Sequence, residues 1–311
     1  MFSAEFFPVL IVACDMLTPL VMRLRLQRAD GAALPAFGAG AHVQVQINGH
    51  GRRAYSLCSN PAELGHYEVA VKLERNGRGG SRALHAMARP GLELMISRPA
   101  NLFALDDDAP HHLLVGGGVG LTPLIAMAYQ LSARSQPFTF MVTVPNDRAW
   151  PFEELLASSG WPVQVVHSPR DKLDLATHLA ALPASTHVYC CGPEGLMARV
   201  REQCVRLPAD QWHEEAFSGT EAVAQTGFEL YLSESGRRLE VPAGGSIIAA
   251  LRMAGVQVET ACEQGICGSC VVPWRDGEPV HADQCLDEED RREYLAICCG
   301  GCRSARLTLA L

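Results

Sequence analysis

The stretch Cys262-Glu-Gln-Gly-Ile-Cys267-Gly-Ser-Cys270 places three cysteines at C-x4-C-x2-C spacing, and Cys298 follows after 27 further residues. This is the plant-type spacing of four thiolates that hold a [2Fe-2S] cluster. The glycines and the serine of the loop favour the same reading, because a loop that wraps a cluster needs small residues and backbone amides that face the sulfur atoms. We therefore expect Cys262, Cys267, Cys270 and Cys298 to bind a [2Fe-2S] cluster.

The identity of the metal and of the fourth ligand has alternatives. A structural zinc site usually shows two similar C-x2-C pairs and often histidine, whereas this segment has one such pair. Cys299 and Cys302 lie almost as far along the chain as Cys298, so spacing alone leaves the fourth thiolate open. Seven of the 12 cysteines crowd into the final quarter of the chain, which favours a metal site in a reducing, cytoplasmic compartment over disulfides.

Composition limits the size class and the partners of the chain. A chain of 311 residues is longer than one hydrophobic core usually accommodates, so two or three domains are expected. The formal charge of -8, with no basic stripe, argues against a nucleic-acid partner. No run reaches the roughly 20 apolar residues that cross a bilayer, so no membrane partner is expected. Residues 226–311 contain 13 acidic and 8 basic side chains, so a protein that docks there is expected to be basic.

Hydrophobic periodicity divides the chain into three segments. Up to about Ser97, short β-rich runs broken by Gly, Pro and Asn predict an antiparallel barrel. From His112 onward, apolar strands alternate with helical segments, which predicts a doubly wound parallel sheet. The small polar residues 218–226 are interpreted as a linker, and the final segment combines strands with a helix that Ser246 is expected to cap. The expected strands are Leu20–Leu26, His42–Ile47, Tyr67–Leu73, Leu92–Ile96, His112–Val115, Phe138–Thr143, Val163–His167, His187–Cys190, Phe228–Leu232, Arg238–Val241 and Leu307–Leu311, and the expected helices include Leu121–Leu131, Phe152–Ser158, Asp174–Leu182 and Ser246–Ala254.

Two motifs in the first segment suit a flavin. Arg53-Ala54-Tyr55-Ser56 combines a guanidinium suited to phosphate, a ring suited to stacking and a hydroxyl that can hydrogen-bond the edge of a flavin. Gly79-Gly80-Ser81 can form a nest of backbone amides for a terminal phosphate, although a simple turn is the alternative reading. Together, in this order on a β-rich segment, the two motifs predict a flavin-binding barrel.

A glycine-rich turn links the first strand of the second segment to its first helix. The arrangement Val115-Gly-Gly-Gly-Val-Gly120 sets a pyrophosphate against helix N-terminal amides, although its glycine spacing differs from the usual dinucleotide fingerprint. Cys191, at the tip of a later strand, is expected beside a nicotinamide ring, with a buried apolar cysteine as the alternative. Phe217 is expected to cover the flavin face or to lie in the core. His111 and His112 are interpreted as a solvated strand entry.

In this order the segments resemble the phthalate dioxygenase reductase family of the ferredoxin-NADP reductase superfamily, over essentially the whole chain. The resemblance rests on the motifs above and on Asn76–Ser81, Pro99–Phe103 and His187–Pro193. It implies a multidomain fold of three parts. These are an FMN-binding antiparallel β-barrel domain at residues 1–105, an NAD-binding α/β domain at 106–217 and, after the linker at 218–226, a β-grasp [2Fe-2S] ferredoxin domain at 227–311.

The resemblance also implies residue roles. Ser56, Thr122 and Cys191 would act at the reacting flavin and nicotinamide rings. Cys298 would be the fourth cluster ligand, since the family's closing segment carries one ligating cysteine followed by a small or apolar residue and then Ser-Arg-Ala. The nicotinamide nucleotide would lie near Gly118, Gly120 and Cys191. The implied FMN contacts are Arg53, Tyr55, Ser56, Val71, Lys72, Gly79, Gly80, Ser81, Thr122 and Phe217.

By the same resemblance the protein is a monomeric reductase that passes electrons from NADH through FMN and the cluster to a Rieske-type non-haem iron oxygenase. That oxygenase would hydroxylate or O-demethylate phthalate or a related aromatic compound. NADH gives up two electrons at once whereas the cluster accepts one, so a flavin is needed between them.

Two stretches depart from the family pattern. Gly300 and Gly301 replace a Ser-Arg pair after the predicted fourth ligand, beside the additional Cys299 and Cys302. At Thr143–Arg148, where the adenine ribose is expected, no carboxylate is available for a 2′-hydroxyl, and Arg148 is suited to a 2′-phosphate. The resemblance nevertheless favours NADH over NADPH.

Two other function classes stay open at this point. The first is a general flavin-dependent NAD(P)H diaphorase or haem reductase, against which the complete ferredoxin segment argues; dye reduction without oxygenase coupling would indicate it. The second is a non-enzymatic redox-sensing or zinc-stabilised module, which a colourless, zinc-containing protein would indicate.

Overall fold

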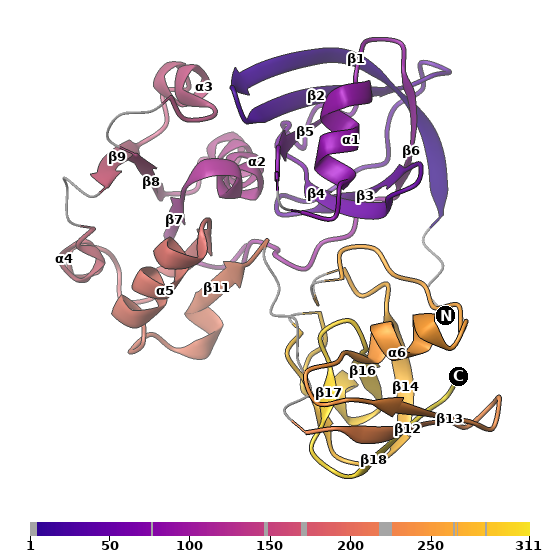
Figure 1. Ribbon diagram of the computed structural model, residues 1–311. Helices are drawn as coiled ribbons and strands as arrows, with labels where there is room; N and C mark the ends of the chain where they lie inside the picture. The colour runs from indigo at the N-terminus through magenta and orange to yellow at the C-terminus, as the bar shows by residue number, and fades with distance from the viewer. Residues whose placement is uncertain are drawn as a thin grey trace. The chain divides into compact units, whose positions relative to one another are not determined.

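The computed structural model describes residues 5–75, 77–145, 149–168, 173–217, 226–263, 265, 267–283 and 285–311. These residues form two compact units, an N-terminal unit of residues 5–217 and a C-terminal unit of residues 226–311 (Figure 1). The expected linker, apart from Thr226, lies outside the described residues. Within the described ranges, no helix is both long and apolar enough to cross a bilayer.

The first part of the N-terminal unit is an antiparallel barrel with the strand order β4-β3-β6-β1-β2-β5. A backbone bridge between Leu57 and Val69 joins the two ends of this order and closes the sheet. Val43, Val45 and Ile47 alternate along β3 and are buried, as the period-2 pattern predicts. The predicted antiparallel barrel is confirmed. Its strands are β1 (Phe6–Thr18), β2 (Val21–Arg28), β3 (His42–Ile47), β4 (Gly51–Ser56), β5 (Tyr67–Lys72) and β6 (Glu93–Ser97).

A helix that the sequence analysis did not predict, α1 (Gly80–Met87), lies between β5 and β6 in the chain. Gly79 precedes it with φ of 90°, a left-handed conformation that suits glycine. Leu84 is fully buried in the barrel core and fixes one face of the helix. Only two turns long and preceded by glycines, α1 offers too little apolar periodicity to be recognised from sequence.

The second part of the N-terminal unit is a parallel sheet with the strand order β11-β10-β7-β8-β9. The order reverses between β7 and β10, which creates a topological switch point at the carboxyl ends of these two strands. The predicted doubly wound sheet is confirmed. Its strands are β7 (His112–Gly116), β8 (Phe138–Pro145), β9 (Val163–Ser168), β10 (His187–Cys191) and β11 (Trp212–Glu215), and its helices are η1 (Gly118–Gly120), α2 (Leu121–Ala133), α3 (Glu153–Ser158), α4 (Leu175–Ala180), α5 (Glu194–Gln203) and η2 (Ala209–Gln211).

The interpretation of His111 and His112 as a solvated strand entry is wrong. His112 is fully buried and His111 nearly so. Because β7 is the central strand, its first residues are covered by neighbours on both sides. The Nε2 atom of His112 lies 2.9 Å from the carbonyl oxygen of Asp106, to which it donates, and this bond compensates the burial of one of the two ring nitrogens.

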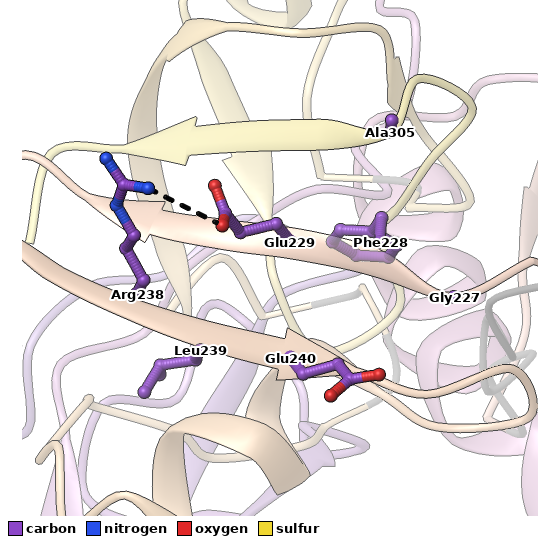
Figure 2. A pocket seen from close by; sticks show the side chains of 7 residues that line it. All are labelled: Gly227, Phe228, Glu229, Arg238, Leu239, Glu240 and Ala305. Carbon is purple, nitrogen blue, oxygen red and sulfur yellow. Dashed lines mark ion pairs between the residues drawn. The ribbon is translucent and has the colours of Figure 1, made fainter.

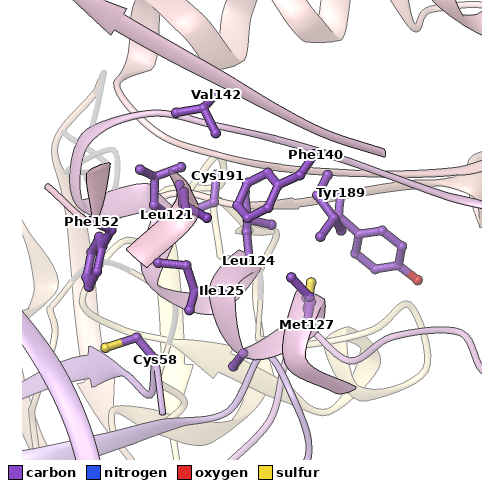
Figure 3. Close-up of a cluster of buried hydrophobic side chains, with 14 of the residues drawn as sticks. Cys58, Leu121, Leu124, Ile125, Met127, Phe140, Val142, Phe152, Tyr189 and Cys191 are labelled. Atoms are coloured by element: carbon purple, nitrogen blue, oxygen red, sulfur yellow. The ribbon is translucent and has the colours of Figure 1, made fainter. Parts of the chain in front are cut away.

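The apolar face of α2 anchors the parallel sheet to the barrel. Figure 3 shows Leu121, Leu124 and Ile125 of this helix packed beneath Phe140 and Cys191, with Cys58 of the barrel on the other side. The amide of Ala39 also donates a hydrogen bond of 3.0 Å to the side chain of Gln130 on α2. The two parts of the N-terminal unit therefore share one core.

The C-terminal unit is a mixed five-stranded sheet with the order β13-β12-β18-β14-β16. Strands β12 and β18 are parallel and the other pairs are antiparallel, and α6 packs on the sheet, as in the expected β-grasp fold. The Oγ atom of Ser246 accepts a hydrogen bond from the amide of Ala249, which confirms the predicted helix cap. The elements are β12 (Phe228–Leu232), β13 (Arg237–Val241), α6 (Ile247–Met253), β14 (Val271–Asp276), β15 (Pro279–Val280), η3 (Asp290–Arg292), β16 (Tyr294–Ala296), β17 (Gly301–Cys302) and β18 (Arg306–Leu309).

Candidate active site and cluster loop

Three residues meet at the switch point of the parallel sheet. Gly116 at the end of β7 pairs with Cys191 at the end of β10, and Cys191 pairs in turn with Glu215 at the end of β11. Ser56, from the last position of barrel strand β4, donates a hydrogen bond of 3.1 Å from its Oγ to Oε2 of Glu215. The barrel and the parallel sheet thus each contribute a polar group to one point.

The carboxyl group of Glu215 is almost completely buried, with 4% of the residue exposed. Burial raises its pKa to about 7, and the hydrogen bond from Ser56 partly opposes this shift. A carboxyl group with this pKa exchanges a proton near neutral pH. Sequence analysis assigned no role to Glu215, because its partner Ser56 is far away in the chain.

Cys191 is fully buried against α2. Burial, with a smaller contribution from Glu215, raises the pKa of its thiol well above the usual value. The side chain is therefore a small neutral group at neutral pH and not a nucleophilic thiolate. It lies at the tip of β10 as expected, and its full burial matches the alternative of a buried apolar cysteine, while its place beside a nicotinamide ring stays a prediction.

A cradle for an anion lies at the start of α1. A Cβ atom on Gly80 would lie 3.0 Å from Nε of Arg53, and one on Gly79 would lie 2.8 Å from the ring of His50. Glycine at both positions therefore lets two cationic or proton-donating side chains approach the first amides of the helix. Backbone amides, a guanidinium and an imidazole suit a phosphate group, so these residues fit the end of a flavin nucleotide.

Tyr55, Val71, Lys72 and Ser81 are the predicted flavin contacts that lie near Arg53 in the first part of the N-terminal unit. Tyr55 is half-buried, and burial raises its pKa to about 12, so its ring stays neutral and suited to stacking. Lys72 forms an ion pair of 2.5 Å with Glu74, whose amide donates to Oγ of Ser81 at 3.0 Å. The carbonyl oxygen of Val71 lies 2.8 Å from Nε2 of His85 on α1. These bonds tie the end of β5 and the residues that follow it to both turns of α1.

The glycine turn after β7 approaches β10 closely. A Cβ atom on Gly120 would lie 2.3 Å from the carbonyl oxygen of Cys191, so no larger residue fits there without a shift. Gly118 has φ of +59°, a left-handed conformation that suits glycine, and open space beside it. The hydroxyl of Thr122 donates to the carbonyl of Val119 at 2.7 Å and stabilises the start of α2. Phe217 is half-buried against the shared core.

The cysteine loop of the C-terminal unit arranges its thiols in two pairs. Cys262 and Cys267 are hydrogen-bonded to each other, as are Cys270 and Cys298. In the part of the chain that the structure describes, no three Cys, His, Asp or Glu side chains converge on a single ion position. Two pairs of thiols fit a binuclear cluster in which each iron takes two thiolates.

Backbone amides of the loop point at these sulfur atoms. The amide of Gly265 donates to Sγ of Cys298 at 3.1 Å, and the amide of Cys267 donates to Sγ of Cys262 at 3.4 Å. Hydrogen bonds, first from the Cys270 thiol and then from the Cys299 thiol, lower the pKa of Cys298 and favour its thiolate form. The donor set and its amides therefore suit a cluster of net negative charge.

The two neighbouring cysteines make different contacts. Cys299 is fully buried; its thiol is hydrogen-bonded to the Cys298 thiol and lies 3.6 Å from the carbonyl of Ala296. The thiol of Cys302 lies 3.3 Å from the carbonyl of Ser304. Of the three candidates for the fourth ligand, Cys298 is the one that the loop amide of Gly265 contacts.

Known proteins match both units. The family described as "2Fe-2S iron-sulfur cluster binding domain" matches residues 230–302. "Phenoxybenzoate dioxygenase subunit beta" of Ectopseudomonas oleovorans is 38% identical over 94% of this chain and 92% of its own length. "Heme-dependent oxidative N-demethylase beta subunit" of Ectopseudomonas mendocina (strain ymp) is 37% identical over 94% and 96%. The solved structure of phthalate dioxygenase reductase, described as a modular structure for electron transfer from pyridine nucleotides to [2Fe-2S], is 35% identical, covers 99% of this chain and 98% of its own, and has a TM-score of 0.76.

The chain belongs to the phthalate dioxygenase reductase family. It is accordingly an iron-sulfur flavoprotein oxidoreductase that uses a pyridine nucleotide. Both the resemblance expected from sequence and the fold that it implied are confirmed.

Two further parts of the chain lie apart from the residues described above. The predicted adenine-ribose segment ends at Asn146–Arg148, which lies outside the described residues. A surface cavity of about 460 Å³ in the C-terminal unit is lined by β12, β13 and Ala305 (Figure 2). Its charged side chains include Arg238 and Glu229, paired at 4.0 Å, and no predicted site residue lines it.

Proposed function

We propose that this protein is the NADH-dependent reductase component of a two-component Rieske non-haem iron oxygenase, with FMN as its flavin. Electron transfer to an oxygenase is the role of its relatives. The observation that carries the proposal is the bond between Ser56 and Glu215 beside Cys191, because it places a proton-exchanging group where barrel and nucleotide-binding sheet meet.

The roles of residues in the N-terminal unit follow from this geometry. Bound FMN would accept hydride from NADH and release its electrons one at a time. Ser56 would present its hydroxyl to the reactive edge of the flavin ring, and Glu215 would hold or accept a proton through Ser56 Oγ. The neutral thiol of Cys191 and the ring of Phe217 would lie beside the flavin and nicotinamide rings and confine them. Thr122 would orient the start of α2, with Gly118 and Gly120 leaving room for the nucleotide.

Arg53 and the amides of Gly79, Gly80 and Ser81 would bind the flavin phosphate, and Tyr55, Val71 and Lys72 would contact its ring and ribityl chain. A monophosphate suits this cradle, which supports FMN over FAD. In the C-terminal unit, Cys262, Cys267, Cys270 and Cys298 would hold the cluster. We further propose the domain limits 1–105, 106–217 and 227–311, and a monomer.

Aromatic compounds are the substrates we propose for the partner oxygenase, since one relative is named for phenoxybenzoate and another for phthalate. A second acceptor class is a haem-dependent oxygenase, which the 37% identity to a haem-dependent N-demethylase subunit favours.

The test combines cofactor and acceptor analysis. Flavin released from the purified protein is identified by mass, and turnover is compared with NADH and with NADPH. The reduced protein is then mixed anaerobically with a Rieske oxygenase and with a haem-dependent oxygenase from the same source. Released FMN, a preference for NADH and faster reduction of the Rieske centre are expected. FAD, a preference for NADPH or reduction of haem alone would contradict the respective part of the proposal.

A further inference from the structure

Three polar side chains of the C-terminal unit gather at the segment that follows β15. The carboxylate of Asp283 has no exposed surface; its Oδ1 lies 3.5 Å from Nδ1 of His281 and its Oδ2 lies 3.5 Å from Nη2 of Arg291. Arg291 also donates to the carbonyl oxygen of Asp283 at 2.6 Å. A buried carboxylate is costly unless it is paired, so this group demands a local reason.

The Asp283 backbone abuts the cysteine loop. A Cβ atom on Gly265 would lie 2.9 Å from Cα of Asp283 and 2.6 Å from Sγ of Cys299. The amide of the same Gly265 donates to Sγ of Cys298. Asp283 therefore packs closely against Gly265, the residue whose amide contacts a cluster thiol.

Further hydrogen bonds keep this support in place. Oδ2 of Asp283 accepts from the amide of Leu286 at 3.1 Å, which fixes the turn that follows. Strand β14 begins directly after Cys270 and carries Trp274. The indole Nε1 of Trp274 donates to the carbonyl of Arg291 at 3.1 Å. The ion pair is thus attached to the loop at Gly265 and to the strand that leaves the loop.

We infer that Asp283 and Arg291 form a positioning pair that holds the cluster loop and sets the reduction potential of the cluster. The inference rests on the proposed function, because it requires a cluster at Cys262, Cys267, Cys270 and Cys298. Reduction adds negative charge to an iron-sulfur cluster, and nearby charges and hydrogen bonds to sulfur shift its potential. Asp283 lowers the potential and Arg291 raises it.

The side chains of Asp283 and Arg291 differ in burial. The Asp283 side chain is fully buried, whereas the Arg291 side chain is 36% exposed, so water screens the cation more than the anion. The carboxylate therefore has the larger effect on the potential. A merely structural role predicts something different: loss of either partner would loosen the same loop and shift the potential in one common direction.

The experiment measures the cluster potential by an anaerobic titration followed by electron paramagnetic resonance, with the flavin potential of the same sample as an internal reference. The variants are Asp283→Asn, which keeps shape and an acceptor, Arg291→Gln and Arg291→Lys. Glu288→Gln is the matched control, because it removes an exposed acidic group from the same segment. Iron content and flavin reduction by NADH are measured on the unmodified protein first, so failure of the proposed function is recognised separately.

The expected results have opposite signs. Asp283→Asn raises the cluster potential, Arg291→Gln lowers it by less, and Arg291→Lys restores most of that loss, while Glu288→Gln changes it least. The flavin potential stays constant throughout. A fall or no change in Asp283→Asn overturns the inference even if Arg291→Gln fails to fold. Equal shifts in Asp283→Asn and Glu288→Gln overturn it as well.

Discussion

Ser56 and Glu215 are 159 positions apart in the chain, yet Oγ of Ser56 donates a 3.1 Å hydrogen bond to Oε2 of Glu215. Ser56 ends a barrel strand and Glu215 ends the last strand of the parallel sheet. This bond connects the buried carboxyl group of Glu215 to the hydroxyl group of Ser56. A proton can pass between them at the site where hydride transfer is proposed.

Replacement of Ser56 by alanine is expected to slow reduction of the flavin by NADH by roughly 10²-fold, the lower end of the range for a positioned proton donor. The rate is measured by anaerobic stopped-flow absorbance. Ser59→Ala is the matched control, since Ser59 is equally buried on the barrel but accepts a hydrogen bond from the amide of Glu68. Equal rates for Ser56→Ala and the unmodified protein would remove Ser56 from the mechanism.

Glu215 makes stability depend on pH. Its pKa in the folded chain, about 7, lies above the ordinary value of 4.5, so the folded state keeps a proton that the unfolded state loses between these limits. Stability therefore falls as pH rises through this window, by up to about 3 kcal/mol, and then stays level. Glu215→Gln removes this fall.

The measurement is urea unfolding of both proteins from about pH 5 to about pH 8, the window that this linkage sets. Glu214→Gln, on the neighbouring residue that pairs with Arg201, is the control and keeps the pH profile of the unmodified protein. A constant stability difference between Glu215→Gln and the unmodified protein across this range would contradict the raised pKa.

Gly120→Ala is expected to destabilise the N-terminal unit by about 1–3 kcal/mol, because the new methyl group would meet the carbonyl of Cys191. It should also raise the KM for NADH, since the turn beside the nucleotide must shift. Gly195→Ala is the control: Gly195 lies on α5 with open space around its Cβ position, so alanine there is neutral or stabilising. Thermal unfolding and steady-state kinetics compare the two. Equal Tm and KM values for both variants would refute the close approach.

Cys298→Ser and Cys299→Ser separate the two candidates for the fourth ligand. Cys298→Ser is expected to lose most of the bound iron and the visible absorption of the cluster, because the thiol beside Cys270 and the Gly265 amide is gone. Cys299→Ser should retain both, because the Gly265 amide contacts Cys298 and a serine hydroxyl can keep the hydrogen bond that the Cys299 thiol makes to Cys298. Iron analysis of the two variants decides, and the reverse result would assign Cys299.

Features encoded locally were predictable from the sequence. The C-x4-C-x2-C spacing and the glycine turn before Leu121 act over a few residues, and the expected strands and helices around them are present within one or two positions. Features that depend on contacts between residues far apart in the chain were not predictable from the sequence. The Ser56–Glu215 bond and the burial of His112 under neighbouring strands both depend on which distant segments meet. Helix α1 escaped prediction because two turns beginning at glycine carry little periodicity.

The proposed electron path requires that NADH reduces both the flavin and the [2Fe-2S] cluster. An anaerobic ultraviolet-visible titration of the purified full chain with NADH, with released flavin and iron quantified, tests this directly. One flavin and one [2Fe-2S] cluster per chain, both bleached by NADH, is the predicted result. Absence of either cofactor, or a flavin that NADH reduces while the cluster stays oxidised, would contradict the proposed electron path.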